Sequence, residues 1–267
     1  MKTEKVVTHI VDWLKEYLTN SNMNGFVIGV SGGVDSAVTS VLCAKTGFPV
    51  LCVEMPIHQA KNQVDRAGEH ILHLKKEFAN VTDIQVDLST TFESLKSVLP
   101  QTDLETEELS LANTRARLRM TTLYYFAGLH RFLVVGTGNK IEDFGVGFFT
   151  KYGDGGVDIS PIADLLKSEV YELGKTLEIS QNILTAPPTD GLFGDDRSDE
   201  MQLGATYDEL EWAMEMAENN RSESDFSGRK LEVFKIYKRL HNANLHKMNP
   251  IPVCEIPKKF RVRSYEL

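Results

Sequence analysis

The stretch Phe26-Val-Ile-Gly-Val-Ser-Gly-Gly-Val-Asp-Ser36 decides the fold that we predict for this chain. Residues 26–30 are an uninterrupted apolar run typical of a buried strand, and residues 37–44 can continue as a helix. Between them, two adjacent glycines allow a tight turn that exposes consecutive N–H groups, and the start of the helix adds partial positive charge. The loop lacks the Gly-Lys-Ser/Thr ending of the common P-loop and does not match the dinucleotide-binding fingerprint. We therefore predict a polyphosphate site of a different kind.

The pattern around this stretch alternates strands and helices. An amphipathic helix at residues 3–19 comes first, and the elements after the loop are a strand at 49–55, a helix near 59–78, a strand near 83–88 and a helix near 90–98. This βαβαβ order predicts an α/β fold with a doubly wound parallel sheet flanked by helices. Ligands of such sheets lie beyond the carboxyl ends of the strands, where the strand order reverses, so residues 54–59 should border an adenosine.

Composition excludes several classes of protein. The 267 residues suffice for one large α/β domain or two smaller ones. A net charge of −9 argues against a protein that wraps nucleic acid or lies on an anionic membrane. Three scattered cysteines suggest neither a disulfide framework nor a structural zinc site. Since we find no signal-peptide core and no apolar run near the ~20 residues of a membrane span, we expect a cytoplasmic protein.

The middle of the chain holds a long helix and a glycine-rich segment. The helix is expected at residues 111–132, and its three arginines, Arg115, Arg117 and Arg119, cannot all face one site. A strand at 132–136 then leads into residues 137–158, a long polar stretch with six glycines. A flexible surface insertion is one interpretation. Its position at the end of a strand favours a functional loop, in which Glu142 could pair with Asp35 around Mg²⁺.

The last part of the chain is expected to be mainly helical. We predict helices at residues 165–177, 207–218 and 228–244, followed by a proline-rich tail that begins at His246. Lys167 falls in the first turn of one helix, where its charge opposes the helix dipole, so an anionic partner would explain its presence.

Several ordered motifs together resemble NAD synthetase, specifically the ammonia-dependent form without a glutaminase domain. The first loop is shared with the wider superfamily of ATP pyrophosphatases, which cleave ATP between the α- and β-phosphates. The string Phe148-Phe-Thr-Lys-Tyr-Gly-Asp-Gly-Gly156 separates NAD synthetases from the other members. The further motifs are Asn113-Thr-Arg-Ala-Arg-Leu-Arg-Met120, Gly136-Thr-Gly-Asn-Lys-Ile-Glu142, Pro188-Thr-Asp-Gly-Leu192 and His246-Lys247.

The resemblance implies one Rossmann-like domain of the ATP pyrophosphatase type over residues 1–267, and a ligase that amidates deamido-NAD with ATP and ammonia. It implies that ATP is bound by Gly29, Val30, Ser31, Gly32, Gly33, Val34, Asp35, Ser36, Thr137, Lys167 and Thr189. It assigns Mg²⁺ to Asp35 and Glu142, deamido-NAD to Arg117, Lys151, Asp158, His246 and Lys247, and catalysis to Asp35, Lys151 and Lys167. It also implies a homodimer in contact through the helix at 111–132.

One motif departs from the family pattern. Gly-Thr-Gly-Asn-Lys, residues 136–140, replaces the Gly-Thr-Asp-His-Ala of many bacterial members, and one residue is added before Phe148. A similar sequence occurs in archaeal-type members. We therefore expect the difference to affect the geometry of the loop and not the chemistry.

Three other interpretations remain open on the sequence. A tRNA-modifying relative would share the first loop, but it would call for a basic surface and usually for catalytic cysteines. A nucleotide sensor without turnover would explain the loop but not Glu142, Lys151 and Lys167. A synthetase subunit fed by a separate glutaminase is the third, since the chain has no glutaminase-like cysteine arrangement of its own.

Overall fold

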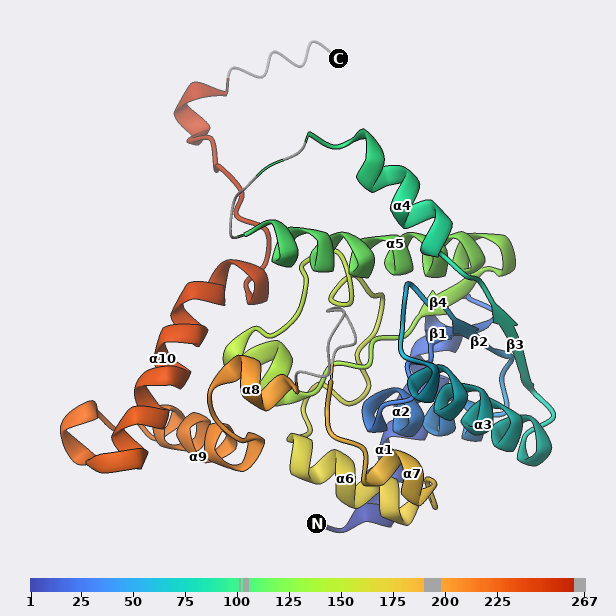
Figure 1. Cartoon of the computed structure of the whole chain (residues 1–267), viewed down its shortest axis with the longest axis horizontal. Coiled ribbons are helices and arrows are strands. Elements are labelled where there is room, and N and C mark those ends of the chain that lie inside the picture. The colour runs from blue at the N-terminus through green and yellow to red at the C-terminus, as the bar shows by residue number, and fades with distance from the viewer. Residues whose placement is uncertain (101, 103–105, 190–197, 262–267) are drawn as a thin grey trace.

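The strands form one four-stranded parallel sheet, on the right-hand side of Figure 1. The computed structural model describes residues 1–100, 102, 106–189 and 198–261. Its strands are β1 (Gly25–Gly29), β2 (Val50–Glu54), β3 (Val81–Gln85) and β4 (Phe132–Val134), in the order β3-β2-β1-β4. The chain builds outward from β1 to β3 and then returns to the other side of β1, so the strand order reverses between β1 and β4. The predicted doubly wound sheet is confirmed.

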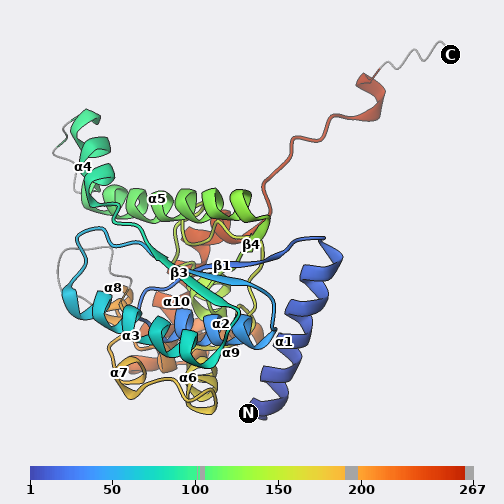
Figure 2. The same ribbon diagram turned by 90° about the vertical axis from the view of Figure 1, so that its right-hand side faces the viewer.

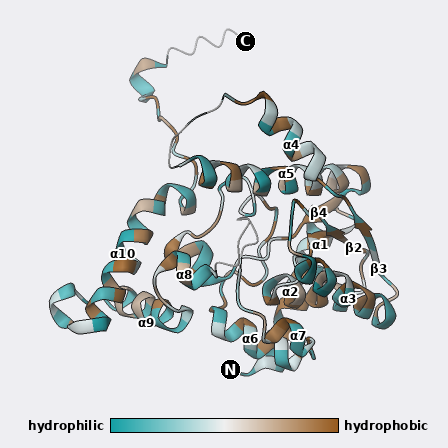
Figure 3. Cartoon of the chain, in the orientation of Figure 1, coloured by the Kyte–Doolittle hydropathy of each residue, from teal (hydrophilic) through white to brown (hydrophobic). Residues whose placement is uncertain are grey.

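Helices cover both faces of this sheet. They are α1 (Thr3–Asn20), α2 (Val34–Lys45), α3 (Lys61–Glu77), α4 (Ser89–Val98), α5 (Glu107–His130), α6 (Lys167–Thr176), α7 (Gln181–Leu184), α8 (Asp199–Leu203), α9 (Tyr207–Glu218) and α10 (Gly228–Met248). Figure 2 shows α5 along one face of the sheet and α2, α3 and α6 along the other. The flanking helices, such as α3 and α5, carry both hydrophobic and hydrophilic residues (Figure 3).

Successive side chains of β1 point to opposite faces of the sheet and pack into a separate hydrophobic core on each face. Phe26 and Ile28 are buried among residues of α1, α2, α3 and α6, whereas Val27 is buried against α4 and α5. Helix α2 is buried over nearly its whole length, because it lies between the sheet and neighbouring helices. This burial explains why the residues of α2 are almost all small or apolar. It also fixes the position of α2, and with it the loop that precedes the helix.

A third core lies away from the sheet. It joins α9 and α10 to a π-helix, η1 (Ile141–Val146), through buried residues that include Ile141, Leu210 and Phe234. The predicted irregular segment at 137–158 therefore contains an ordered turn of helix. Gly147 ends η1 with a left-handed φ of +66°, and a Cβ there would lie 2.3 Å from the Cβ of Asn244, so α10 packs directly on this turn.

Three predicted boundaries are corrected. The third strand begins at Val81 rather than 83 and ends at Gln85, because Asp87 accepts a hydrogen bond from the Ser89 backbone N–H and starts α4. Helix α5 begins at Glu107, four residues early, and it ends where Arg131 adopts a left-handed conformation. Strand β4 has three residues instead of the five predicted at 132–136. Elsewhere the predicted elements lie close to those observed.

The end of α10 differs from the prediction in a way that affects the candidate site. The helix continues to Met248, so His246 and Lys247 lie in its last turn and not in the tail. The motif at 188–192 falls partly outside the described residues. Within the described part of the chain, no helix has the length and apolar character needed to cross a membrane.

A buried histidine of α3 is hydrogen-bonded to a serine of α2. His70 is 5% exposed, and its Nε2 lies 2.9 Å from the hydroxyl oxygen of Ser40. Burial lowers the pKa of His70 from 6.5 to about 4. Between these pH values the unfolded chain binds a proton at His70 that the folded protein does not. The contribution of neutral His70 to the free energy of unfolding is therefore fully present above pH 6.5 and is lost as the pH falls toward 4.

We therefore expect replacement of His70 by glutamine to reduce the acid sensitivity of folding. From pH 7 to pH 4.5, the free energy of unfolding of H70Q should fall by about 2–3 kcal/mol less than that of the unchanged protein. Urea denaturation at the two pH values measures this difference. The control is H73Q, which changes an exposed histidine on the same helix. An equal loss for H70Q and the unchanged protein would contradict the buried neutral state of His70.

Candidate functional site

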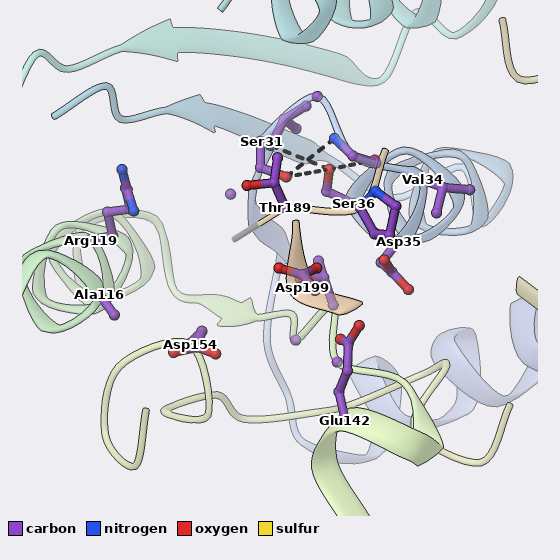
Figure 4. A pocket seen from close by; sticks show the side chains of 18 of the residues that line it. Ser31, Val34, Asp35, Ser36, Ala116, Arg119, Glu142, Asp154, Thr189 and Asp199 are labelled. Carbon is purple, nitrogen blue, oxygen red and sulfur yellow. Dashed lines mark hydrogen bonds between the residues drawn. The ribbon is translucent and has the colours of Figure 1, made fainter. Parts of the chain in front are cut away.

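The main candidate site is a cavity of about 270 Å³ at the carboxyl ends of β1 and β4 (Figure 4). It lies where the strand order reverses, as expected for a doubly wound sheet. The inner face of α5 contributes Ala116, Met120 and Leu123 to its wall, and the end of β2 contributes Val53 and Met55. All of the residues that the resemblance assigned to ATP line it: Gly29, Val30, Ser31, Gly32, Gly33, Val34, Asp35, Ser36, Thr137, Lys167 and Thr189.

The loop after β1 is held in one conformation by its own side chains. The Ser36 hydroxyl donates to the Gly33 carbonyl oxygen (3.0 Å) and lies 3.2 Å from the Ser31 hydroxyl (Figure 4). Gly32 has a left-handed φ of +83°, and a Cβ there would lie 2.7 Å from the Gln63 carbonyl oxygen. Gly33 precedes the first turn of α2 without a side-chain cap, so the positive end of this helix faces the cavity.

A buried cluster of opposite charges occupies one wall of the cavity. The Lys167 ammonium is 2.5 Å from Oδ2 of Asp35 and 3.0 Å from Oε1 of Glu142. These residues come from α6, α2 and η1, and the side chains are 5%, 16% and 16% exposed respectively. The anionic partner expected for Lys167 is therefore present. Asp35 and Glu142 are brought together, as predicted, but the cation between them is the lysine.

The charge state of Lys167 follows from its partners. Burial by itself would lower the pKa of the ammonium, but the carboxylates of Asp35 and Glu142 outweigh burial and raise the pKa above its ordinary value. The ammonium also lies 4.9 Å from the centre of the Tyr207 ring. Lys167 is therefore positively charged in the folded protein at every physiological pH.

Two further residues position this cluster, and neither is among the predicted site residues. Asn139 is completely buried, donates to Oδ1 of Asp35 (3.1 Å) and accepts from the Glu142 backbone N–H (3.1 Å). The Tyr207 hydroxyl donates to Oε1 of Glu142 (2.6 Å) and lies 3.3 Å from Oδ2 of Asp199. Burial and the nearby carboxylates raise the pKa of Tyr207, which keeps its hydroxyl proton in place.

Sequence signals for these two residues differ in strength. Asn139 belongs to Gly-Thr-Gly-Asn-Lys, the motif that differs from many bacterial members of the family. Its position just after a buried strand is a sequence signal for a site residue. Tyr207 stands at the start of α9, distant in sequence from Glu142, and its local pattern is that of an ordinary amphipathic helix. Only packing of α9 against η1 reveals its contact.

The cavity carries an excess of negative charge. Besides the two carboxylates at Lys167, it is lined by Asp143, Asp154 and Asp199. Burial, together with the neighbouring carboxylates, raises the pKa of Asp143 to about 8. In residues 1–100, 102, 106–189 and 198–261, no three Asp, Glu, His or Cys side chains are placed to hold a metal ion by themselves. A metal ion here would need oxygen ligands from a bound molecule in addition to protein carboxylates.

A second group of predicted residues forms a basic cluster that is not part of the cavity lining. The Arg117 guanidinium donates to the Lys151 carbonyl oxygen (3.3 Å), and Lys151 Nζ donates to the His246 carbonyl oxygen (2.6 Å). Lys247 Nζ donates to the carbonyl oxygens of Gly147 and Phe149. The structure thus brings together four of the five residues assigned to deamido-NAD, and it places Lys151 apart from Asp35 and Lys167.

Asp158, the fifth of these residues, has a different setting. It accepts hydrogen bonds from the Tyr124 hydroxyl (3.0 Å) and the Val134 backbone N–H (2.8 Å), which link the segment after the cavity wall to α5 and β4. The structure does not join Asp158 to the basic cluster.

The three arginines of α5 point to different places, as helical geometry predicted. Arg115 stacks on the Phe92 ring at 4.5 Å, Arg117 reaches Lys151, and Arg119 donates to the Met55 carbonyl oxygen (3.0 Å) at the cavity. Arg119 was not among the predicted site residues. Its position beside the predicted adenosine border places a cation on the wall opposite the phosphate loop (Figure 4).

Comparison with known proteins gives a consistent result over nearly the whole chain. The protein-family model described as NAD synthase matches residues 6–250 of this chain. The NH(3)-dependent NAD(+) synthetase of Carboxydothermus hydrogenoformans is 39% identical over 259 residues, which cover 96% of each chain. The solved NMN synthetase of Francisella tularensis has a TM-score of 0.80 and 31% identity, covering 97% of this chain and 99% of that one. NH3-dependent NAD synthetase from Campylobacter jejuni has a TM-score of 0.76 and 26% identity, covering 96% and 100%.

The contacts of Asn139 lead to a prediction about stability. N139A would leave Oδ1 of Asp35 and the Glu142 backbone N–H without a buried partner, and we expect the free energy of unfolding to fall by about 1–3 kcal/mol. Urea denaturation measures the change. N242A is the matched control, because it makes the same replacement at an exposed position of α10 and should change stability by less than about 0.5 kcal/mol. Equal effects of the two replacements would show that Asn139 does not support the charged cluster.

Proposed function

The chain belongs to the NAD synthase family, and we propose that it makes NAD from deamido-NAD, ATP and ammonia, with release of AMP and pyrophosphate. It is an enzyme of the ligase class, and its catalysis depends on ATP. The observation that carries the proposal is the cavity at the reversal of strand order, where the phosphate loop, Asp35, Glu142 and Lys167 converge. A fold of this type binds nucleotides at this place.

We assign the ATP triphosphate to the loop of residues 31–36 and the first turn of α2. The uncapped helix start and the left-handed turn at Gly32 favour an anion there. Lys167 supplies the nearest fully buried positive charge, and Thr137 and Thr189 line the same cavity. Met55 and Arg119 border the far wall, which suits the adenosine.

Asp35 and Glu142 would hold Mg²⁺, and their donor set fits this ion. Mg²⁺ prefers carboxylate oxygens, retains several waters and usually binds with substrate phosphates rather than in an all-protein cage. Two converging carboxylates beside a phosphate loop match this preference, and the absence of a third arranged ligand among the described residues agrees with it. When bound, the ion would neutralise charge that develops on the phosphates.

We assign deamido-NAD to Arg117, Lys151, Asp158, His246 and Lys247. Three of these residues have basic side chains, and the described contacts gather them between α5, the segment after η1 and the end of α10. The pyrophosphate of a dinucleotide carries negative charge that such a surface can neutralise. Asp158, fixed by Tyr124 and Val134, offers a carboxylate at a separate position, where it suits a hydroxyl donor.

The reaction must turn a carboxylate oxygen into a leaving group, because ammonia does not displace oxide. A nicotinate oxygen attacks the α-phosphorus of ATP, and the bond to the β-phosphate oxygen breaks to release pyrophosphate. Ammonia then attacks the carbonyl carbon of the resulting acyl adenylate, the carbon–oxygen bond to AMP breaks, and the proton lost by the nitrogen passes to solvent. Backbone N–H groups of the loop and the Lys167 ammonium stabilise the phosphates as their charge shifts.

Similarity to the Francisella protein supports a second candidate acceptor. That protein's name, NMN synthetase, indicates amidation of a mononucleotide, which lacks the adenylyl half of deamido-NAD. Both acceptors present the same nicotinate carboxylate, so the chemistry in the cavity is shared. Parallel assays with nicotinate mononucleotide and deamido-NAD distinguish them: the larger kcat/KM identifies the acceptor, and a preference for the mononucleotide would overturn our assignment.

We also propose that the protein forms a homodimer through the outer face of α5. Tyr125 and Leu129 are 64% and 60% exposed on this helix. The segment after α10 extends away from the body (Figure 2) and exposes Ile251, Val253 and Phe260. Such apolar surface is typical of an interface.

We expect purified protein mixed with ATP, Mg²⁺, ammonium and deamido-NAD to produce AMP and NAD in equal amounts, and to produce no AMP when deamido-NAD is omitted. D35N should lower the rate of AMP formation by about a hundredfold or more, because it removes charge at the phosphate site. D164N makes the same replacement at a fully exposed carboxylate and should leave the rate unchanged. Nucleotide binding without AMP would instead indicate a sensor, and little activity with either free ammonium or glutamine would favour a subunit fed by a separate glutaminase.

The proposed dimer is tested by a charge on its contact face. Y125D should convert the dimer to a monomer in light scattering coupled to size-exclusion chromatography, because an aspartate would lose its hydration at the interface. L72D places the same charge at an exposed residue of α3, on the opposite face of the sheet, and should remain dimeric. A monomeric unchanged protein, or a dimeric Y125D, would exclude the α5 interface.

A further inference from the structure

The position between Asp35 and Glu142 is occupied by a side chain of the protein itself. The Lys167 ammonium lies within hydrogen-bond distance of one oxygen of each carboxylate. A divalent ion held by the same two oxygens would need the space that the ammonium fills. The lysine and the metal ion therefore cannot use these oxygens in this arrangement at the same time.

The carboxylates are also engaged by neutral donors. Asn139 donates to Oδ1 of Asp35, and Tyr207 donates to the same Glu142 oxygen that accepts from Lys167. Both donors are buried, and Lys167 itself is 5% exposed. The arrangement is thus a satisfied network in which hydrogen bonds and an ion pair compensate the buried charges, as burial of charge requires.

Removal of the ammonium without replacement would be costly. The cavity also contains Asp154 and Asp199, so an uncompensated pair of carboxylates at its wall would repel neighbouring negative charge. Bound ATP would change this balance, because its phosphates would attract Lys167 and would bring oxygen ligands for a metal ion. The protein alone lacks such ligands within its described residues, as no three metal-binding side chains converge there.

We propose that Lys167 is a built-in counter-ion of the metal site, so that a divalent ion enters between Asp35 and Glu142 only together with the nucleotide. The inference rests on the assignment of these two carboxylates to Mg²⁺ under the proposed function. Lys167 exchanges partners in the process: it leaves the carboxylates, and its ammonium contacts the phosphates. Lys167 thereby couples metal binding to nucleotide binding and keeps free metal ions from occupying the empty enzyme.

The test measures binding of Mn²⁺ to the full chain without nucleotide, by the electron paramagnetic resonance signal of free Mn²⁺. K167M and K167Q should bind Mn²⁺ on the order of tenfold or more tightly than the unchanged protein, because the competing ammonium is gone. R66M is the matched control, since Arg66 lines the same cavity but its guanidinium donates to the Gly32 carbonyl oxygen rather than to a carboxylate. It should change Mn²⁺ affinity by less than about threefold.

A second measurement separates this inference from the proposed function. With α,β-methylene-ATP, an analogue that cannot be cleaved at the reacting bond, the unchanged protein should bind Mn²⁺ tightly. Absence of any Mn²⁺ binding with the analogue would overturn the metal assignment itself. Tight nucleotide-dependent binding, together with equal nucleotide-free affinities for K167M and the unchanged protein, would overturn only the role of Lys167. An R66M effect as large as that of K167M would do the same, because it would show a general effect of charge.

A crystallographic soak covers the case in which neither Lys167 variant folds. Nucleotide-free crystals of the unchanged protein soaked in MnCl₂ should show no anomalous peak between Asp35 and Glu142, and crystals soaked with the analogue as well should show one. A peak between the carboxylates in the nucleotide-free crystals would contradict the inference.

Discussion

A buried ammonium between two carboxylates is the interaction on which the candidate site depends. Lys167, Asp35 and Glu142 come from three elements that are far apart in sequence, and their attraction fixes α6, α2 and η1 relative to one another at the edge of the sheet. Because the three charges are largely removed from water, each needs the others, and Asn139 and Tyr207 complete their hydrogen bonding. Under the proposed function, the same charges would serve a triphosphate and its metal ion. The contact that stabilises this wall of the cavity would then also be the one that binding rearranges.

The sheet determines where this cluster can form. A doubly wound sheet has its ligand crevice where the strand order reverses, here between β1 and β4, and the loop after β1 and the segment after β4 both line it. Burial of α2 on nearly every side makes the loop before it rigid, so its N–H groups are arranged before a ligand arrives. The third core, which packs η1 on α9 and α10, supports Glu142 in the same way from the opposite wall.

Charge is divided between two neighbouring regions. The cavity wall has five acidic residues against one lysine and two arginines, whereas the cluster of Arg117, Lys151 and Lys247 is basic. A nucleotide with its metal ion and an anionic acceptor have different electrostatic requirements, so the division agrees with the two substrates of the proposed function. Under that proposal, Lys151, which is not part of the cavity lining, belongs to the acceptor side.

The sequence by itself determined the alternation of strands and helices, the phosphate loop and the family, since each depends on local periodicity or on residues close together in the chain. It also indicated that Lys167 needed an anion, because a lysine in a first helical turn opposes the local dipole. Tertiary structure alone decided which anions those are, that Tyr207 reaches Glu142, that His246 and Lys247 belong to α10, and that Asp158 stands apart from the basic cluster. These contacts join residues separated by tens of positions or more, and their geometry is set by the packing of whole elements, which local patterns do not encode.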